Sequence, residues 1–225
     1  MKIELEQVLP SQIEARSFEI IGRELEQMGK VLDPEQEPVI KRCIHTTADF
    51  EYADSLVFSD RAVERGLKAL KAGAHIVTDT RMGFSGVNKG RLEKLGGEAL
   101  CFMADPDVAE IAAREGCTRA TASMDKAAGL YGTGGPRERI PCIFAVGNAP
   151  TALARLYELV TEGRLKPALV IGVPVGFVNV VQSKELILTL PDTPYIVARG
   201  RKGGSNVAAA ICNALLYQCQ SVPEA

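Results

Sequence analysis

Five short apolar runs, each followed by a loop rich in glycine, proline or asparagine, divide this chain. The clearest is residues 168–173, a nearly continuous apolar run that is rich in β-branched side chains and too short for a core helix. Such a run predicts a strand buried on both faces in the middle of a sheet. The same pattern recurs at residues 75–80, 99–103, 140–146 and 195–199.

Segments with a helical spacing of apolar residues lie before and between these runs. The first covers residues 11–28, where Ser11 and Glu14 have the spacing of a capping box. Ser59 and Asp105 stand where N-terminal caps of later helices are expected. A helix that begins at 33–34 or at 38 should carry residues 45–50 at or just past its last turn. A third helix is predicted from the Ser59 cap to Gly73, and further helices at residues 88–95, 106–115, 118–130, 151–161 and 205–219.

Strands that alternate with helices predict parallel pairing through helical crossovers. The chain is therefore expected to form one α/β domain over residues 1–225, with a mainly parallel five-stranded sheet, helices on both faces, and an N-terminal helical segment before it. In such a sheet the ligand lies beyond the carboxyl ends of the strands, so the five loops should converge on one site.

Composition agrees with a single domain and excludes some partners. Apolar residues make up 46% of the 225, enough for a sizeable core, and no long polar tract is present. The 26 Lys and Arg against 28 Asp and Glu give a net charge of −2, which does not favour nucleic acid or an anionic membrane. The first residues lack an apolar signal core, and Pro174 interrupts the most hydrophobic window, so a cytoplasmic protein is expected.

Cysteine spacing predicts neither a metal site nor disulfides. The six cysteines include no CxxC pair, and most lie inside apolar runs, as reduced core thiols do. No protein-bound metal is expected.

His45 is the stronger candidate for proton transfer among the two histidines. It is expected near a helix C-terminus with Asp49 and Glu51 close in sequence. The negative end of the helix dipole and the carboxylates would both favour an imidazolium that can act as a general acid at neutral pH. The alternative is a surface histidine whose ring caps helix carbonyls. His75 opens a strand and is interpreted as structural.

The loop that follows the last strand has the chemistry of an anion site. Glycines there expose backbone N–H groups, Ser205 is placed to cap the next helix, and Arg201 and Lys202 add positive charge. Gly203 belongs to the same loop, and Arg199 ends the strand before it. Neither the Walker nor the dinucleotide pattern is present, so a nucleotide is not indicated; a plain tight turn before a capped helix is the alternative.

Other candidates occupy the remaining loops. Asn148 stands at a strand-to-helix junction, where its amide could bind a carboxylate or complete an Asx turn. Arg119 at a helix start is electrostatically unfavourable and hints at an anionic ligand. Asp79 ends a strand and would point into the crevice or cap the following loop. Met82 follows the same strand, and Ser17 on the first helix could face a ligand.

Eight segments of the chain together resemble the precorrin-8X methylmutase family, and its cobalt-precorrin-8 branch more closely. They run in order over about residues 10–217: IEARSFEII, IHTTADF, TDTRM, GCTRA, GNAPTAL, GVPVGFV, QSKE and GRKGGSNVAAAICNAL. The resemblance implies an isomerase of cobalamin biosynthesis that moves a methyl group from ring carbon 11 to ring carbon 12 of a corrinoid precursor. It also implies a homodimer with sites near the subunit interface, no cofactor, and a catalytic histidine that matches His45.

One position departs from the family pattern, because Gln182 stands where a glutamate is common before Ser-Lys-Glu. The substrate implied by the family is a large flat ring that carries acetate and propionate carboxylates, which accounts for the cations gathered on the loops. Whether that ring contains cobalt is left open by the sequence. The alternatives are a non-catalytic carrier of a corrinoid or another polycarboxylate, and an NAD-dependent oxidoreductase, which lacks support because no glycine-rich fingerprint follows the first strand.

Overall fold

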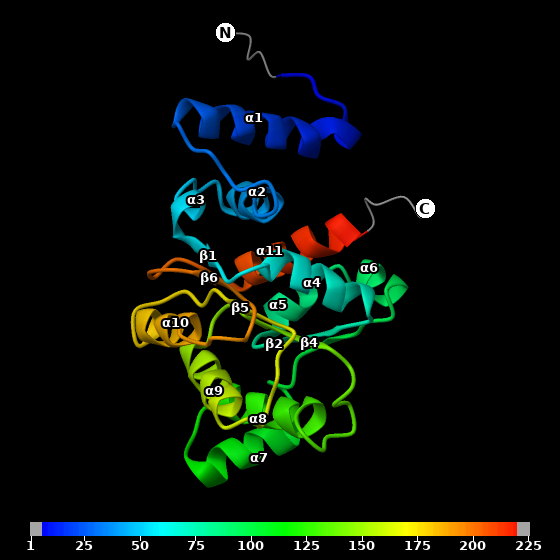
Figure 1. Cartoon of the computed structure of the whole chain (residues 1–225), viewed down its shortest axis with the longest axis vertical. Coiled ribbons are helices and arrows are strands. Elements are labelled where there is room, and N and C mark those ends of the chain that lie inside the picture. The colour runs from blue at the N-terminus through cyan, green and yellow to red at the C-terminus, as the bar shows by residue number, and fades with distance from the viewer. Residues whose placement is uncertain (1–5, 220–225) are drawn as a thin grey trace.

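The computed structural model describes residues 6–219 and contains one six-stranded sheet with helices on both faces (Figure 1). The spatial order of strands is β1-β6-β5-β4-β2-β3. All neighbouring pairs are parallel except β1 and β6, which run antiparallel. The strands are β1 Leu56–Phe58, β2 His75–Thr78, β3 Ala99–Leu100, β4 Cys142–Val146, β5 Leu169–Gly172 and β6 Tyr195–Ala198.

The five predicted strands are all present, and β5 lies in the interior of the sheet between β4 and β6, as expected. The predicted number was wrong by one, because β1 was missed. β1 has only three residues, Leu56–Phe58, and lies at an edge, where pairing with β6 rather than its own pattern makes it a strand. A short edge strand carries little apolar signal of its own.

Alternation along the strands divides the interior into two apolar layers. In β4, Ile143 and Ala145 join the core on one face, while Phe144 and Val146 join the core on the other. Because successive strand side chains point to opposite faces, a strand buried on both sides reads as a continuous apolar run. The sequence pattern of residues 140–146 is therefore explained by the two layers.

Figure 1 shows helices α2, α4 and α11 above the sheet and α7, α8 and α9 below it, with α1 outermost on α2. The upper layer and the N-terminal segment comprise the short 3-10 helix η1 Pro10–Gln12 and helices α1 Ile13–Gln27, α2 Glu37–Thr47, α3 Tyr52–Ser55, α4 Ala62–Lys71, α5 Arg81–Gly86, α6 Lys89–Lys94 and α11 Ser205–Cys219. The lower layer comprises α7 Pro106–Glu115, α8 Arg119–Tyr131, α9 Pro150–Thr161 and α10 Val180–Leu188.

Most helices were predicted to within a few residues, and α7 and α11 have the predicted bounds. Helices α3, α5 and α10 were not predicted. α3 and α5 are short, with four and six residues, and α10 groups its apolar residues at its two ends, so none shows a clear helical spacing. α10 matters for the site, because it follows the loop after β5 and carries a buried lysine described below.

Three predicted caps were wrong. Ser11 lies in η1, and α1 starts without a side-chain cap. Ser59 accepts a hydrogen bond from the Tyr195 N–H (2.9 Å) and so secures β6 instead of α4. The Asp105 carboxylate precedes α7 but binds Lys126 Nζ at 2.7 Å. The side chains of Ser59 and Asp105 make long-range hydrogen bonds instead, which sequence spacing does not reveal.

Candidate active site

The loops that follow β2, β4, β5 and β6 meet at the carboxyl ends of the parallel strands. The Gly204 N–H donates to Val173 O (2.9 Å), and the Gly176 N–H donates to Arg201 O (3.2 Å), which joins the loops after β5 and β6. The Ser205 and Thr80 hydroxyl oxygens lie 2.8 Å apart and link α11 to the loop after β2. The predicted convergence of these loops is therefore confirmed.

Asp79 organises the loop after β4. Its side chain is only 1% exposed, and its carboxylate accepts backbone hydrogen bonds from Gly147 (2.9 Å), Asn148 (2.8 Å) and Ala149 (2.7 Å). Burial raises the pKa of the Asp79 carboxyl, and the three N–H donors oppose that rise. Asp79 was expected either to point into the crevice or to cap the following loop. This geometry supports a cap, so Asp79 positions the loop after β4 rather than contacting a ligand.

Two glycines allow the loops to approach each other closely. A Cβ on Gly147 would lie 2.6 Å from Ser205 Cα, and a Cβ on Gly203 would lie 2.1 Å from Val173 O. Gly203 also has φ of 156°, a conformation that favours glycine. Gly203 was predicted to contact a ligand. It is also required for steric reasons, because the loop after β6 packs directly against the end of β5.

His45 lies in the last turn of α2, as predicted, and its side chain is exposed at this edge of the molecule. The imidazole stacks on the ring of Phe18 from α1, with centroids 5.3 Å apart and planes inclined by 15°. The guanidinium of Arg42 covers the Phe18 ring at 4.7 Å. Ser17 on this helix was predicted as a possible ligand contact, whereas the neighbouring Phe18 was not predicted to lie at the site.

The carboxylates expected beside His45 bind a different cation. Asp49 and Glu51 both accept hydrogen bonds from Lys202 Nζ, at 2.7 and 2.6 Å. This hydrogen bond lowers the pKa of Asp49, and the two carboxylates raise the pKa of Lys202. The expectation that these carboxylates directly stabilise a protonated His45 is therefore corrected. Both of them bind Lys202, which lies 153 positions after Asp49 and 151 after Glu51.

The four predicted cations differ in their partners. Arg199 forms an ion pair with Glu185 (3.2 Å), and Lys202 is paired as described. Arg201 lies over the ring of Phe177, 5.3 Å from its centroid, and has no carboxylate partner in residues 6–219. Arg119 is exposed at the first position of α8 and likewise has no ion pair within the described chain.

The remaining predicted residues lie on the same set of elements. Asn148 is exposed on the loop that Asp79 holds, and Met82 is 70% exposed on α5. Ser17 is half-buried on α1, where its hydroxyl donates to Ile13 O (2.9 Å). Ser205 is buried at the start of α11, so it joins two loops and does not face outward.

Lys184 of α10 was missed by the sequence analysis. Its side chain is fully buried, and its ammonium donates to the carbonyls of Gly200 (2.9 Å) and Lys202 (2.8 Å). Burial lowers the pKa of Lys184 to about 8. The sequence gives no signal for it, because Lys184 stands among Gln182, Ser183 and Glu185, where a solvated side chain is the ordinary expectation.

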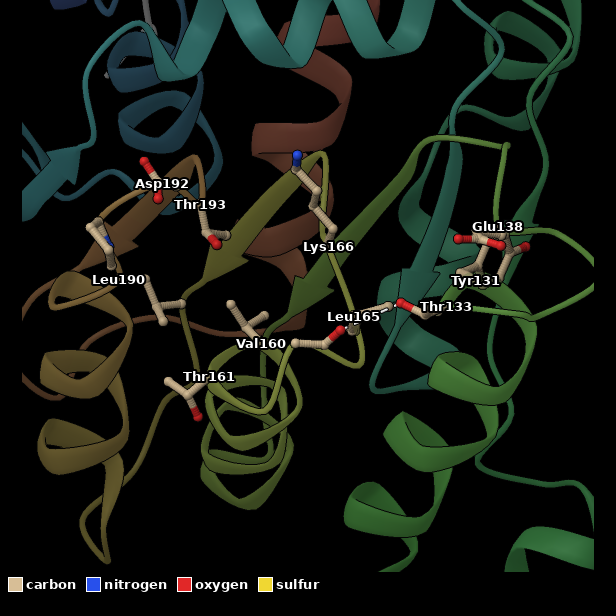
Figure 2. A pocket seen from close by; sticks show the side chains of 13 residues that line it. Tyr131, Thr133, Glu138, Val160, Thr161, Leu165, Lys166, Leu190, Asp192 and Thr193 are labelled. Carbon is tan, nitrogen blue, oxygen red and sulfur yellow. Dashed lines mark hydrogen bonds between the residues drawn. The ribbon is translucent and has the colours of Figure 1, made fainter.

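Hollows at the two ends of the sheet differ in size. A cavity of about 650 Å³ lies at the amino ends of β5 and β6, where its lining includes Tyr131, Leu165, Lys166, Leu190 and Thr193 (Figure 2). At the carboxyl edge, a hollow of about 270 Å³ is lined by Thr46 of α2 and Asn206 of α11, among others. The candidate site is assigned to the carboxyl edge, because the interlinked loops, the exposed His45, Arg119 and Arg201 lie there.

No group of three or more His, Cys, Asp or Glu residues in positions 6–219 is arranged to hold a metal ion. All six cysteines, which fall within that range, are free thiols. No helix in the part of the chain that the structure describes is long and apolar enough to cross a membrane.

Comparisons with known proteins agree with one another. The family model described as CbiC, precorrin-8X methylmutase, matches residues 12–218. A cobalt-precorrin-8 methylmutase from Priestia megaterium is 46% identical over 92% of this chain and 88% of its own length. A precorrin-8X methylmutase from Pseudomonas aeruginosa is 38% identical over 89% of this chain and 91% of its own. The crystal structure of precorrin-8X methyl mutase from Thermus thermophilus superposes with a TM-score of 0.80 at 41% identity, covering 93% of this chain and 96% of that one.

Proposed function

Because the chain belongs to the precorrin-8X methylmutase family, we propose that it isomerises a precorrin-8 in cobalamin biosynthesis by moving a methyl group from ring carbon 11 to ring carbon 12. The observation that carries the proposal is His45, an exposed imidazole at the carboxyl edge of the sheet, stacked on Phe18 and close to the cation-bearing loops. The proposed substrate contains cobalt, since relatives named for cobalt-precorrin-8 reach 46% identity, against 38% for the Pseudomonas precorrin-8X enzyme.

His45 acts as the general acid in this proposal. Protonation of a ring nitrogen draws π electrons toward it and lowers the barrier to migration of the methyl group. The carbon–carbon bond at carbon 11 breaks as the bond at carbon 12 forms, and the proton is returned afterwards, so substrate and product remain isomers. The Phe18 ring holds the imidazole in place by stacking on it, with the centroids 5.3 Å apart.

The other predicted residues bind the substrate in this proposal. Arg119 and Arg201 contribute unpaired positive charge for its carboxylates, and Asn148 contributes an exposed amide. Met82 and Phe177 offer exposed apolar surface to a flat ring. Arg199 and Lys202 belong to the same loop but are already paired, so they position it.

A single chain leaves this site open. A corrinoid ring bearing several carboxylates does not fit in a hollow of about 270 Å³, which is below the range typical for drug-sized ligands. The loop after β5 also leaves Val175, Phe177 and Val178 exposed to solvent. A homodimer in which the second copy helps to enclose the substrate accounts for both observations.

The free thiols of all six cysteines favour a reducing compartment, the cytoplasm.

Turnover of cobalt-precorrin-8 and of its metal-free counterpart, followed through the visible spectrum, tests the proposal. His45→Ala should lower kcat by about 10² to 10⁴ with the fold unchanged, because this is the usual contribution of general acid catalysis and the side chain is exposed. The chain supplies a matched control in its second histidine, His75, which is buried at the opposite edge and lies 2.7 Å from the Tyr131 hydroxyl. His75→Gln should retain turnover per folded molecule.

Two outcomes would contradict the proposal. A wild-type protein that binds the corrinoid product but turns over neither substrate would be a carrier. Normal turnover by His45→Ala would remove this histidine from the chemistry while leaving the isomerase assignment in place.

A further inference from the structure

Lys184 combines full burial with the absence of a carboxylate partner. Its side chain is 0% exposed, and no ion pair within residues 6–219 involves it. Its two hydrogen bonds go to backbone carbonyls of Gly200 and Lys202. A buried cation without a counter-ion is costly, and an apolar side chain of similar volume would avoid that cost. The buried ammonium of Lys184 therefore indicates a function other than packing.

The two carbonyls that Lys184 binds determine where two N–H groups point. The described chain contains no cis peptide bond, and in a trans peptide the C=O and N–H groups point in opposite directions. The Gly200 carbonyl shares its peptide with the Arg201 N–H, and the Lys202 carbonyl shares its peptide with the Gly203 N–H. Both N–H groups thus point away from the buried ammonium, and neither has a hydrogen-bond partner in residues 6–219.

The rest of the loop is held so that these two peptides cannot easily rotate. The intervening Arg201 carbonyl accepts from the Gly176 N–H, and the following Gly204 N–H donates to Val173 O. Arg201 also presents an exposed guanidinium with no carboxylate partner among the described residues. Two free N–H groups and one free guanidinium on one turn form a receptor for an oxyanion.

We propose that Lys184 is a positioning residue that orients the loop after β6 so that the backbone N–H groups of Arg201 and Gly203 bind one carboxylate of the substrate. The inference rests on the proposed function, because it assumes that the polycarboxylate ring binds at this edge. Lys184 touches only the inner side of the loop, and the substrate contacts its outer side.

Titrations with hydrogenobyrinic acid, the metal-free product, and with its fully amidated derivative test this role. Lys184→Met should weaken binding of the acid about 10- to 100-fold, the equivalent of one or two charge-assisted hydrogen bonds. Binding of the amide should change less than about threefold. KM should rise with a smaller change in kcat, since the residue does not touch the reacting carbons. Lys166→Met, an exposed lysine at the opposite edge, should change neither affinity.

A purely structural role predicts a different result, in which both ligands lose affinity equally, and that outcome would overturn the inference. Because Lys184→Met leaves two carbonyls without their donor, the variant could unfold. The wild-type protein then provides the decisive measurement: in amide-resolved NMR spectra, the N–H signals of Arg201 and Gly203 should move downfield with the acid and not with the amide. Unmoved signals would equally overturn it. A wild type that turns over substrate while failing these tests refutes only this inference, whereas loss of wild-type turnover refutes the proposed function.

Discussion

The residue type alone does not show whether a charged side chain is free to bind a ligand, because its charge can already be paired with a neighbour. Arg199 and Lys202 were predicted to bind substrate on the same grounds as Arg201, yet both already hold carboxylates. Their partners, Glu185, Asp49 and Glu51, lie 14 to 153 positions away in the chain. A free cation can attract an oxyanion, whereas a paired one must first give up its partner.

This difference predicts unequal effects of two neighbouring substitutions. Arg201→Ala should weaken binding of hydrogenobyrinic acid by about 1 to 3 kcal/mol, because it removes a charged donor that has no competing partner. Lys202→Ala should weaken it less, since that ammonium already serves Asp49 and Glu51. Isothermal titration of both variants measures the two affinities. A larger loss for Lys202→Ala would show that its carboxylates release it when substrate binds.

At the scale of elements, the site is built almost entirely by the connections between strands and helices. The loops after β5 and β6 contact each other through backbone atoms, and the side chains of Asp79 and Thr80 join the loop after β2 to the loop after β4 and to α11. Gly147 has ordinary backbone angles but lies where any Cβ would collide with Ser205 and Gly204. A glycine is needed at position 147 because the main chain packs closely against residues 204–205, and not because the backbone there requires conformational freedom.

Glycine-to-alanine substitutions at two positions test that distinction. Gly147→Ala should lower the free energy of unfolding by about 1 to 3 kcal/mol, the usual cost of overpacking, because Cβ would lie 2.6 Å from Ser205 Cα. Gly129→Ala is the control: it lies inside α8 with no atom within 4 Å of the added Cβ, and should raise that free energy by about 0.5 to 1 kcal/mol. Urea unfolding measures both. Equal effects would mean that the loops yield to the added methyl group.

Sequence periodicity predicted most of the longer helices and the buried strands, but it did not predict β1, α3, α5, α10 or the contacts between loops. Buried strands such as β4 were predictable because both faces are apolar, and helices such as α11 because their ends carry clear signals. The position of His45 followed from a helix end, but Phe18, which stacks on it, belongs to another helix. Lys184 escaped notice because its partners are carbonyls, and carbonyls have no sequence signature.

For the whole molecule, the distribution of apolar surface favours association through the edge that carries the site. Phe177 and Val178 are 80% and 76% exposed, and Met82 is 70% exposed on α5. Adjoining exposed apolar side chains commonly mark an interface. The cavity of about 650 Å³ lies at the opposite edge, so a second copy bound at the carboxyl ends would leave it accessible.

Substitution of the loop after β5 tests this association. Phe177→Ser should weaken the homodimer and raise the dissociation constant at least tenfold, because a large aromatic side chain would leave the interface. Val31→Ser, at a residue that is 97% exposed between α1 and α2, should leave it unchanged. Sedimentation velocity over a range of concentrations gives both constants. A monomeric wild type at all concentrations would exclude the proposed dimer.

The bridge from Lys202 to Asp49 joins residues 153 positions apart and has a consequence for synthesis of the protein. Lys202 is translated 153 residues after Asp49, and it follows β6 in the chain. A prematurely terminated product that ends before β6 would contain His45, the proposed acid, without the loop that is proposed to bind the ring. Truncated copies should therefore be inert rather than partly active.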